Sequence, residues 1–208
     1  QEPMTSLNPL HTINKQIEEI ILTHNKISKK EAKNKTLELL NEVGLGDIAD
    51  RPKIYPYELS GGQRQRAMIA MSIANNPDVL IADEPTTALD VTIQNQILDL
   101  LLSLQKKLGM TMLFISHDLS VVKKMSDFIY VMKNGEIVES GSNEKIFMKP
   151  EHAYTKQLIS TQNKKKINFN RSKKTILKVE NLDVWYPIKK GIFKSTIDYV
   201  KAIKKISF

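Results

Sequence analysis

Two short runs in the first half of the chain limit its fold more than any other part of the sequence. Residues 59–66 read Leu-Ser-Gly-Gly-Gln-Arg-Gln-Arg, a glycine turn followed by good helix formers. Residues 79–85 read Val-Leu-Ile-Ala-Asp-Glu-Pro, a short apolar run that ends in two carboxylates. Only residues 67–78 separate them, so both runs belong to one folded unit. Together they indicate phosphate binding and metal-assisted hydrolysis.

The segment Ser60-Gly61-Gly62 places a hydroxyl and unobstructed backbone N–H groups where a helix is expected to begin. A helix N-terminus carries unpaired donors and a partial positive charge, so it attracts a phosphate group. Glycine permits a close approach of the backbone that a β-carbon would block. A lone Ser-Gly-Gly is more often a plain helix cap, and only the complete run of residues 59–66 favours the phosphate site.

The carboxylates of Asp83 and Glu84 follow the apolar run directly. One of them can hold Mg²⁺, directly or through water, and the other can orient or deprotonate an attacking water. His117 follows a second apolar run at residues 112–115, and its imidazole can bond a γ-phosphate oxygen. Taken singly, each is as well explained as an ordinary strand-end acid or a structural histidine. Their shared place after buried strands favours a site, because the carboxyl ends of parallel strands meet at one edge.

Strand and helix patterns alternate along the chain, which predicts an α/β fold with a largely parallel sheet. Strands buried on both faces are expected at residues 79–82 and 112–115. An Asn-Gly pair at residues 134–135 predicts a tight hairpin between 128–132 and 136–139. Further strands are expected at 175–184 and 200–208. Helices are expected at two stretches within 12–43 and at 62–75, 91–107, 119–124 and 151–160.

The charge of the chain is unevenly distributed. Its 208 residues carry a net charge of +8, yet residues 1–163 hold 18 basic and 20 acidic residues, whereas residues 164–208 hold 13 and 3. The excess is therefore local, and a solvated basic linker explains it better than contact with RNA or anionic lipid. The sequence has no cysteine, which excludes disulfides and thiolate metal sites. It also has no apolar run of about 18 residues that could span a bilayer.

Taken together, these motifs resemble those of the ATP-binding-cassette (ABC) ATPases. Residues 59–63 match the signature motif of that family, residues 79–84 match its Walker B strand and catalytic glutamate, and residues 87–90 match its D-loop. His117 matches the switch histidine and Gln1 the Q-loop glutamine, which links the nucleotide site to the membrane subunits. The resemblance covers residues 1–140 in the correct order. It implies a P-loop NTPase-like fold in which a helical subdomain, at about residues 8–76, accompanies the parallel sheet.

The resemblance also implies the ligands and their residues. ATP and Mg²⁺ are the expected cofactors. Three groups of residues would act on them: catalytic Glu84, His117 and Gln1; ATP-binding Ser60, Gly61, Gly62, Gln63, Asp90 and Tyr186; and metal-binding Asp83 and Gln1. The implied partners are transmembrane permease subunits, a second cassette and, indirectly, a solute-binding protein, at the cytoplasmic face of the membrane. No nucleic acid is expected.

Within the family, residues 1–9, 83–90 and 150–155 resemble the oligopeptide, dipeptide and nickel importer branch. That branch often has proline where Ala153 stands, and some members carry a cysteine cluster that is absent here. Residues 175–208 resemble the start of a second cassette, with Tyr186 where an aromatic residue stacks on adenine. The expected organisation is a first cassette at 1–160, a basic linker at 161–174 and a second cassette from 175.

The sequence contains no G-x-x-x-x-G-K-[ST] phosphate loop, and Lys194-Ser195 lacks the glycine that this loop requires. We expect the chain to be an internal segment, with one phosphate loop before Gln1 and another after Phe208. The isolated segment would then neither bind ATP tightly nor hydrolyse it. Two alternatives stay open: a soluble ABC ATPase of translation or DNA repair, and an inactive truncated product.

Overall fold

The computed structural model describes residues 6–162, 177–190 and 195–208 and divides the chain into two units, Gln1–Lys164 and Lys165–Phe208. The first unit holds a parallel and an antiparallel two-stranded sheet, and the second holds one antiparallel sheet. Among the described residues, no helix is both long enough and apolar enough to cross a membrane.

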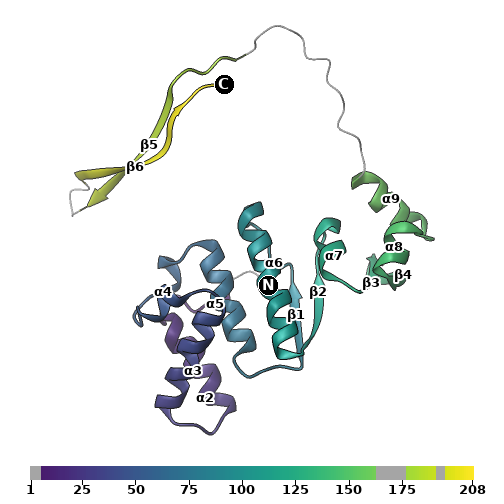
Figure 1. Ribbon diagram of the computed structural model, residues 1–208, viewed down its shortest axis with the longest axis horizontal. Coiled ribbons are helices and arrows are strands. Elements are labelled where there is room, and N and C mark those ends of the chain that lie inside the picture. Colours follow the sequence, from purple (N-terminus) through teal and green to yellow (C-terminus); the bar gives the residue numbers. More distant parts are fainter. Residues whose placement is uncertain (1–5, 163–176, 191–194) are drawn as a thin grey trace. The chain divides into compact units, whose positions relative to one another are not determined.

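A cluster of helices precedes the first strand (Figure 1). It consists of α2 (Ile13–His24), α3 (Lys29–Glu42), the short α4 (Gly46–Ala49), the 3₁₀ turn η1 (Pro56–Glu58) and α5 (Gly61–Ile73). The helices predicted within residues 12–43 and at 62–75 are confirmed. A capping box starts α3: Ser28 Oγ accepts from the N–H of Glu31 at 3.2 Å, and the N–H of Ser28 donates to Glu31 Oε2 at 2.8 Å.

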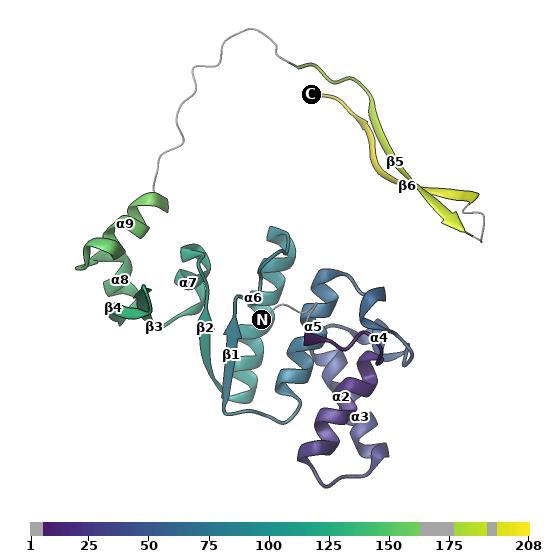
Figure 2. The same cartoon turned by 180° about the vertical axis from the view of Figure 1, so that it is seen from behind.

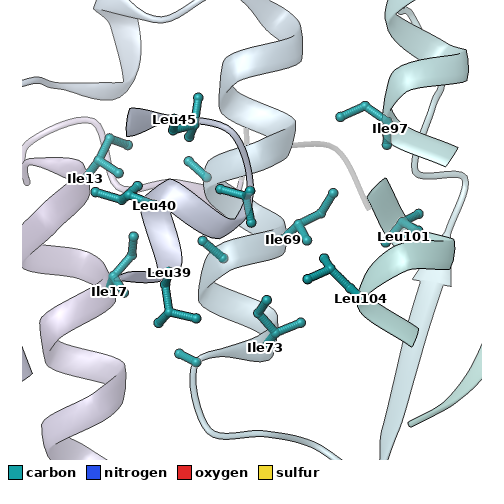
Figure 3. Close-up of a cluster of buried hydrophobic side chains, with 14 of the residues drawn as sticks. Ile13, Ile17, Leu39, Leu40, Leu45, Ile69, Ile73, Ile97, Leu101 and Leu104 are labelled. Atoms are coloured by element: carbon teal, nitrogen blue, oxygen red, sulfur yellow. The ribbon is translucent and has the colours of Figure 1, made fainter. Parts of the chain in front are cut away.

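The helical cluster shares one hydrophobic core with α6 (Val91–Leu108) (Figure 3). The core consists of interlocking isoleucine and leucine side chains, of which these are at most 1% exposed: Ile13, Ile17, Leu40, Ile73, Ile97, Leu101 and Leu104. Burial of one such side chain contributes about 1.5–3 kcal/mol. This core therefore fixes the position at which α5 begins relative to α6.

Strands β1 (Val79–Asp83) and β2 (Thr111–Ile115) pair in parallel, as predicted, and the helical cluster and β1 lie on opposite sides of α6 (Figure 1, Figure 2). Leu80 joins the core with α6 and with α7 (Leu119–Met125), whereas Val79 and Ile81 are 56% and 64% exposed. The expectation of strands buried on both faces is therefore wrong for the described residues. Side chains alternate across a strand, and α6 and α7 cover one face.

The predicted hairpin is present, as β3 (Phe128–Lys133) and β4 (Glu136–Ser142). Asn134 and Gly135 both have positive φ, 52° and 83°, as a type I′ turn requires. An unpredicted helix, α8 (Asn143–Met148), packs on this hairpin. The last helix, α9 (Ala153–Gln162), begins two residues later than expected, after the N–H groups of residues 151 and 152 have bonded to the Glu139 carboxylate.

The described part of the second unit contains β5 (Leu182–Lys190) and β6 (Ser195–Ile206), which pair in antiparallel orientation. The predicted strand at 175–184 was placed too early, and its first two residues lie outside the described part of the chain. Asn181 has a left-handed φ of 53°, and its N–H donates to Ser207 Oγ at 3.0 Å instead of joining the ladder. This interruption delays the regular strand to Leu182. The partner strand begins at Ser195, five residues before the predicted start.

Candidate functional site

Ser60 is the exposed N-cap of α5. Its Oγ accepts a hydrogen bond from the N–H of Gln63 at 3.3 Å, and its own N–H donates to Gln63 Oε1 at 3.0 Å. A hydroxyl offers one donor and two acceptor positions, so Ser60 can cap the helix and still donate its proton to a phosphate oxygen. The capping and the phosphate-binding interpretations are therefore compatible.

The loop that leaves β1 has an unusual backbone at Glu84. Its N–H donates to the carbonyl of Ile115 at 2.9 Å, and its φ is 44°, in the left-handed region that only a few per cent of non-glycine residues adopt. The N–H of Thr87 donates back to the carbonyl of Glu84 at 3.2 Å. Backbone strain of this kind concentrates at functional sites.

The Glu84 side chain meets His117 at the carboxyl edge of the sheet. Nδ1 of His117 lies 2.9 Å from Oε1 of Glu84, and the Thr87 hydroxyl donates to Oε2 at 2.9 Å. An ionised carboxylate only accepts, so Nδ1 is the protonated nitrogen of this pair. The structure thus brings together two of the residues that the sequence placed at strand ends, and adds Thr87.

This contact shifts the pKa values of Glu84 and His117 in opposite directions. The hydrogen bond from His117, and after it that from Thr87, hold the pKa of Glu84 below its ordinary value of 4.5. The hydrogen bond to Glu84 and the negative charge of Glu84 raise the pKa of His117 above 6.5. The side chains are 38% and 76% exposed, so water screens the pair and it adds little stability. Its effect is on geometry and charge state.

Of the other predicted residues, Asp83, Asp90 and Tyr186 are described and take no part in this contact. Asp90 is the N-cap of α6, and its Oδ1 accepts from the N–H of Ile93 at 3.0 Å. Asp83 is half-buried at the end of β1. Tyr186 is 61% exposed on β5 and belongs to the second unit. Gln1 lies outside the described residues.

The donors at the strand edge fit Mg²⁺ in its usual mode of binding. No group of three or more His, Cys, Asp or Glu side chains within the described ranges could hold a metal by itself. Mg²⁺, however, is commonly bound through one or two carboxylates, with waters and substrate phosphates completing its shell. Asp83 supplies a hard oxygen donor of that kind beside Glu84.

Several contacts between segments of the chain were not identified from sequence. Arg66 links the carbonyl of Val43, at 2.7 Å, to Gln96 of α6, at 3.3 Å. Gln16 is 7% exposed; its Oε1 accepts from the N–H of Asn8, and its Nε2 donates to the carbonyl of Asn8. These partners are distant in sequence or need a known loop geometry, so no local pattern indicates them. Thr87 had a signal, because its spacing of three residues from Glu84 suits a turn.

Residues 1–87 match the ABC transporter family. The chain is 53% identical over 207 residues, 99% of its length, to the peptidoglycan transport ATP-binding protein YejF of Agrobacterium fabrum, and 54% identical over 159 residues, 76% of its length, to the dipeptide transport ATP-binding protein DppD of Haemophilus influenzae. It spans only 38% and 48% of those relatives.

Solved cassettes have the same fold. The ATP-binding cassette MJ0796, in a dimeric post-hydrolysis state bound to ADP and Pi, superposes with a TM-score of 0.58 and 32% identity over 66% of this chain and 59% of that one. CbiO1 of Clostridium perfringens, part of the ABC transporter complex CbiONQ, gives 0.62 and 28% over 71% and 57%. With the motifs and the strand-edge geometry, these matches show that residues 1–87 belong to an ABC transporter domain and that the chain has the α/β fold of an ABC ATPase cassette.

Proposed function

We propose that the chain is part of the ATP-hydrolysing subunit that supplies energy to an ABC importer for peptides or similar small solutes. The observation that carries this proposal is the contact of Glu84 with His117 and Thr87 at the carboxyl edge of the β1–β2 sheet. It sets a carboxylate and an imidazole beside Asp83, as metal-assisted attack of water on a phosphate requires. Relatives named for peptidoglycan, dipeptide and oligopeptide transport support the solute class.

Each side chain at this edge has a distinct role in the proposal. Asp83, with Gln1, would hold Mg²⁺, and the ion would supply positive charge to the ATP phosphates. Glu84 orients the attacking water and accepts its proton. Because Nδ1 of His117 donates to Glu84, Nε2 is the nitrogen left to bind a γ-phosphate oxygen, and it donates only when the ring is protonated. The raised pKa of His117 favours that protonated form.

The signature residues serve a different ATP molecule in this proposal. Ser60, Gly61, Gly62 and Gln63 contact ATP that is held mainly by a second cassette, with Asp90 close to the interface and Tyr186 stacking on adenine in that second cassette. The Agrobacterium relative supports a tandem arrangement, because it is a much longer chain than the Haemophilus relative. The 207 matched residues are only 38% of the Agrobacterium protein, whereas 159 matched residues are 48% of the Haemophilus protein.

The proposed partners are transmembrane permease subunits and, through them, a solute-binding protein, with the cassettes at the cytoplasmic face of the membrane. The competing function is that of a soluble ABC ATPase in translation or DNA repair, which the basic excess of residues 164–208 favours slightly. Co-purification separates the two, because the importer subunit should bring down membrane proteins and the competing ATPase ribosomes or DNA-repair proteins.

Replacement of the proposed base tests the mechanism. In the full-length protein, Glu84→Gln keeps the shape of the side chain and removes its basicity, so steady-state ATP turnover should fall by about a hundredfold or more while ATP binding persists. Glu139→Gln is the matched control, because Glu139 bonds the backbone N–H groups of residues 151 and 152, away from this edge. An unchanged turnover in Glu84→Gln would refute the role as base.

A further inference from the structure

The start of α5 is packed directly against the start of α6. A β-carbon placed on Gly62 would lie 2.7 Å from Cγ2 of Ile93, 3.9 Å from its Cβ and 4.0 Å from its Cδ1. A β-carbon on the neighbouring Gly61 would meet only Cδ2 of Leu89, at 3.4 Å. The two adjacent glycines therefore differ. A β-carbon at Gly61 would make an ordinary van der Waals contact, whereas a β-carbon at Gly62 would clash with Ile93.

Ile93 cannot easily give way. It is β-branched and lies in the first turn of α6, where one χ1 rotamer is strongly preferred, so Cγ2 is held one bond from a helical Cβ. It is half-buried and packs against the hydrophobic core. The backbone N–H of the same residue is bonded to Asp90 Oδ1 at 3.0 Å, which fixes this turn further.

We infer that the packing against Ile93 is the primary reason why residue 62 must be glycine, independently of any contact with a phosphate. We also infer that Ile93 is a positioning residue. By packing its γ-methyl on Gly62, Ile93 holds the N-terminus of α5, with the Ser60 hydroxyl, at a fixed place relative to Asp90 and the loop that begins at Glu84. The consequence for ATP turnover rests on the proposed function, whereas the packing itself does not.

The test is a double-mutant cycle between residues 62 and 93 in the full-length protein, read by ATP turnover and by thermal unfolding. Gly62→Ala should lower turnover about tenfold or more and lower the Tm. Addition of Ile93→Ala, which removes every γ carbon, should restore most of the lost turnover, and the combined Tm loss should be smaller than the sum of the two single losses. Addition of Ile93→Val should restore neither, because valine keeps both γ carbons.

Gly61→Ala is the matched control, since its β-carbon has no clash to relieve and Ile93→Ala should not improve its turnover or Tm. Additive losses in the Gly62 cycle would overturn the inference, and so would a restored Tm without restored turnover. If Gly62→Ala alone fails to fold, recovery of folded protein by Ile93→Ala counts as the rescue. Absence of ATP turnover in the wild-type protein would refute the proposed function. The Tm values of the double-mutant cycle would still show whether Gly62 and Ile93 interact.

Discussion

Glu84 has both of its carboxylate oxygens occupied, one by His117 and one by Thr87. In this arrangement its pKa is lowered, so it is ionised but a weaker proton acceptor than a free carboxylate. A base for water attack needs at least one oxygen turned towards that water. Each carboxylate oxygen keeps a second lone pair, so in the proposed site Glu84 can accept a proton from the attacking water while His117 and Thr87 stay bonded to it.

The charge pair has a defined pH window. The pKa of His117 is raised above 6.5 in the folded protein. Its contribution to the free energy of unfolding is therefore full below pH 6.5 and is lost as pH rises through the folded pKa. The pKa of Glu84 is lowered below 4.5 in the folded protein. Its contribution to the free energy of unfolding is therefore full above pH 4.5 and is lost as pH falls through the folded pKa. The pair is therefore fully charged between pH 4.5 and pH 6.5.

Glu84→Gln should return the pKa of His117 towards its ordinary value, because glutamine keeps an acceptor but removes the negative charge. The pKa is measured by NMR titration of the His117 ring protons in the 208-residue chain. Thr87→Ala serves as the control: it removes the hydroxyl on Oε2 and leaves the ion pair, so the pKa of His117 should stay raised. An identical His117 titration in wild type and Glu84→Gln would show that the two side chains do not interact in solution.

At the scale of elements, two helices begin with the same capping box and differ in what surrounds it. Ser28 caps α3 at a remote exposed turn, and Ser60 caps α5 in the signature run. The local rules for caps account for the box at Ser28. The same rules hold for Ser60, which shows that a cap explains its backbone role and leaves its hydroxyl proton available.

Ser28→Ala and Ser60→Ala should therefore cost a similar free energy of unfolding, about 1 kcal/mol each, by denaturant titration. Only Ser60→Ala should also weaken ATP-dependent turnover of the full-length protein, since only that hydroxyl is proposed to reach a phosphate. Equal turnover in the two variants would limit Ser60 to a structural role.

At the scale of the whole molecule, the sequence predicted the longer helices, the parallel pair of strands and the Glu84–His117 edge, because each follows from local periodicity and from the geometry of parallel sheets. It misplaced the burial of Ile81, since a run of apolar residues does not tell which face is covered. It missed Arg66 and Gln16, whose partners are set by how the elements pack. It also placed the strand at 175–184 too early, because the left-handed Asn181 gives no periodic signal.

We propose that the chain holds complementary parts of two ATP sites, and its sequence lacks the phosphate loop that would complete either one. Isothermal titration calorimetry with Mg-ATP, on the 208-residue chain and on the full-length protein side by side, tests it most directly. We expect micromolar or tighter binding by the full-length protein and no measurable heat of binding for the 208-residue chain. Micromolar affinity in the 208-residue chain would contradict it.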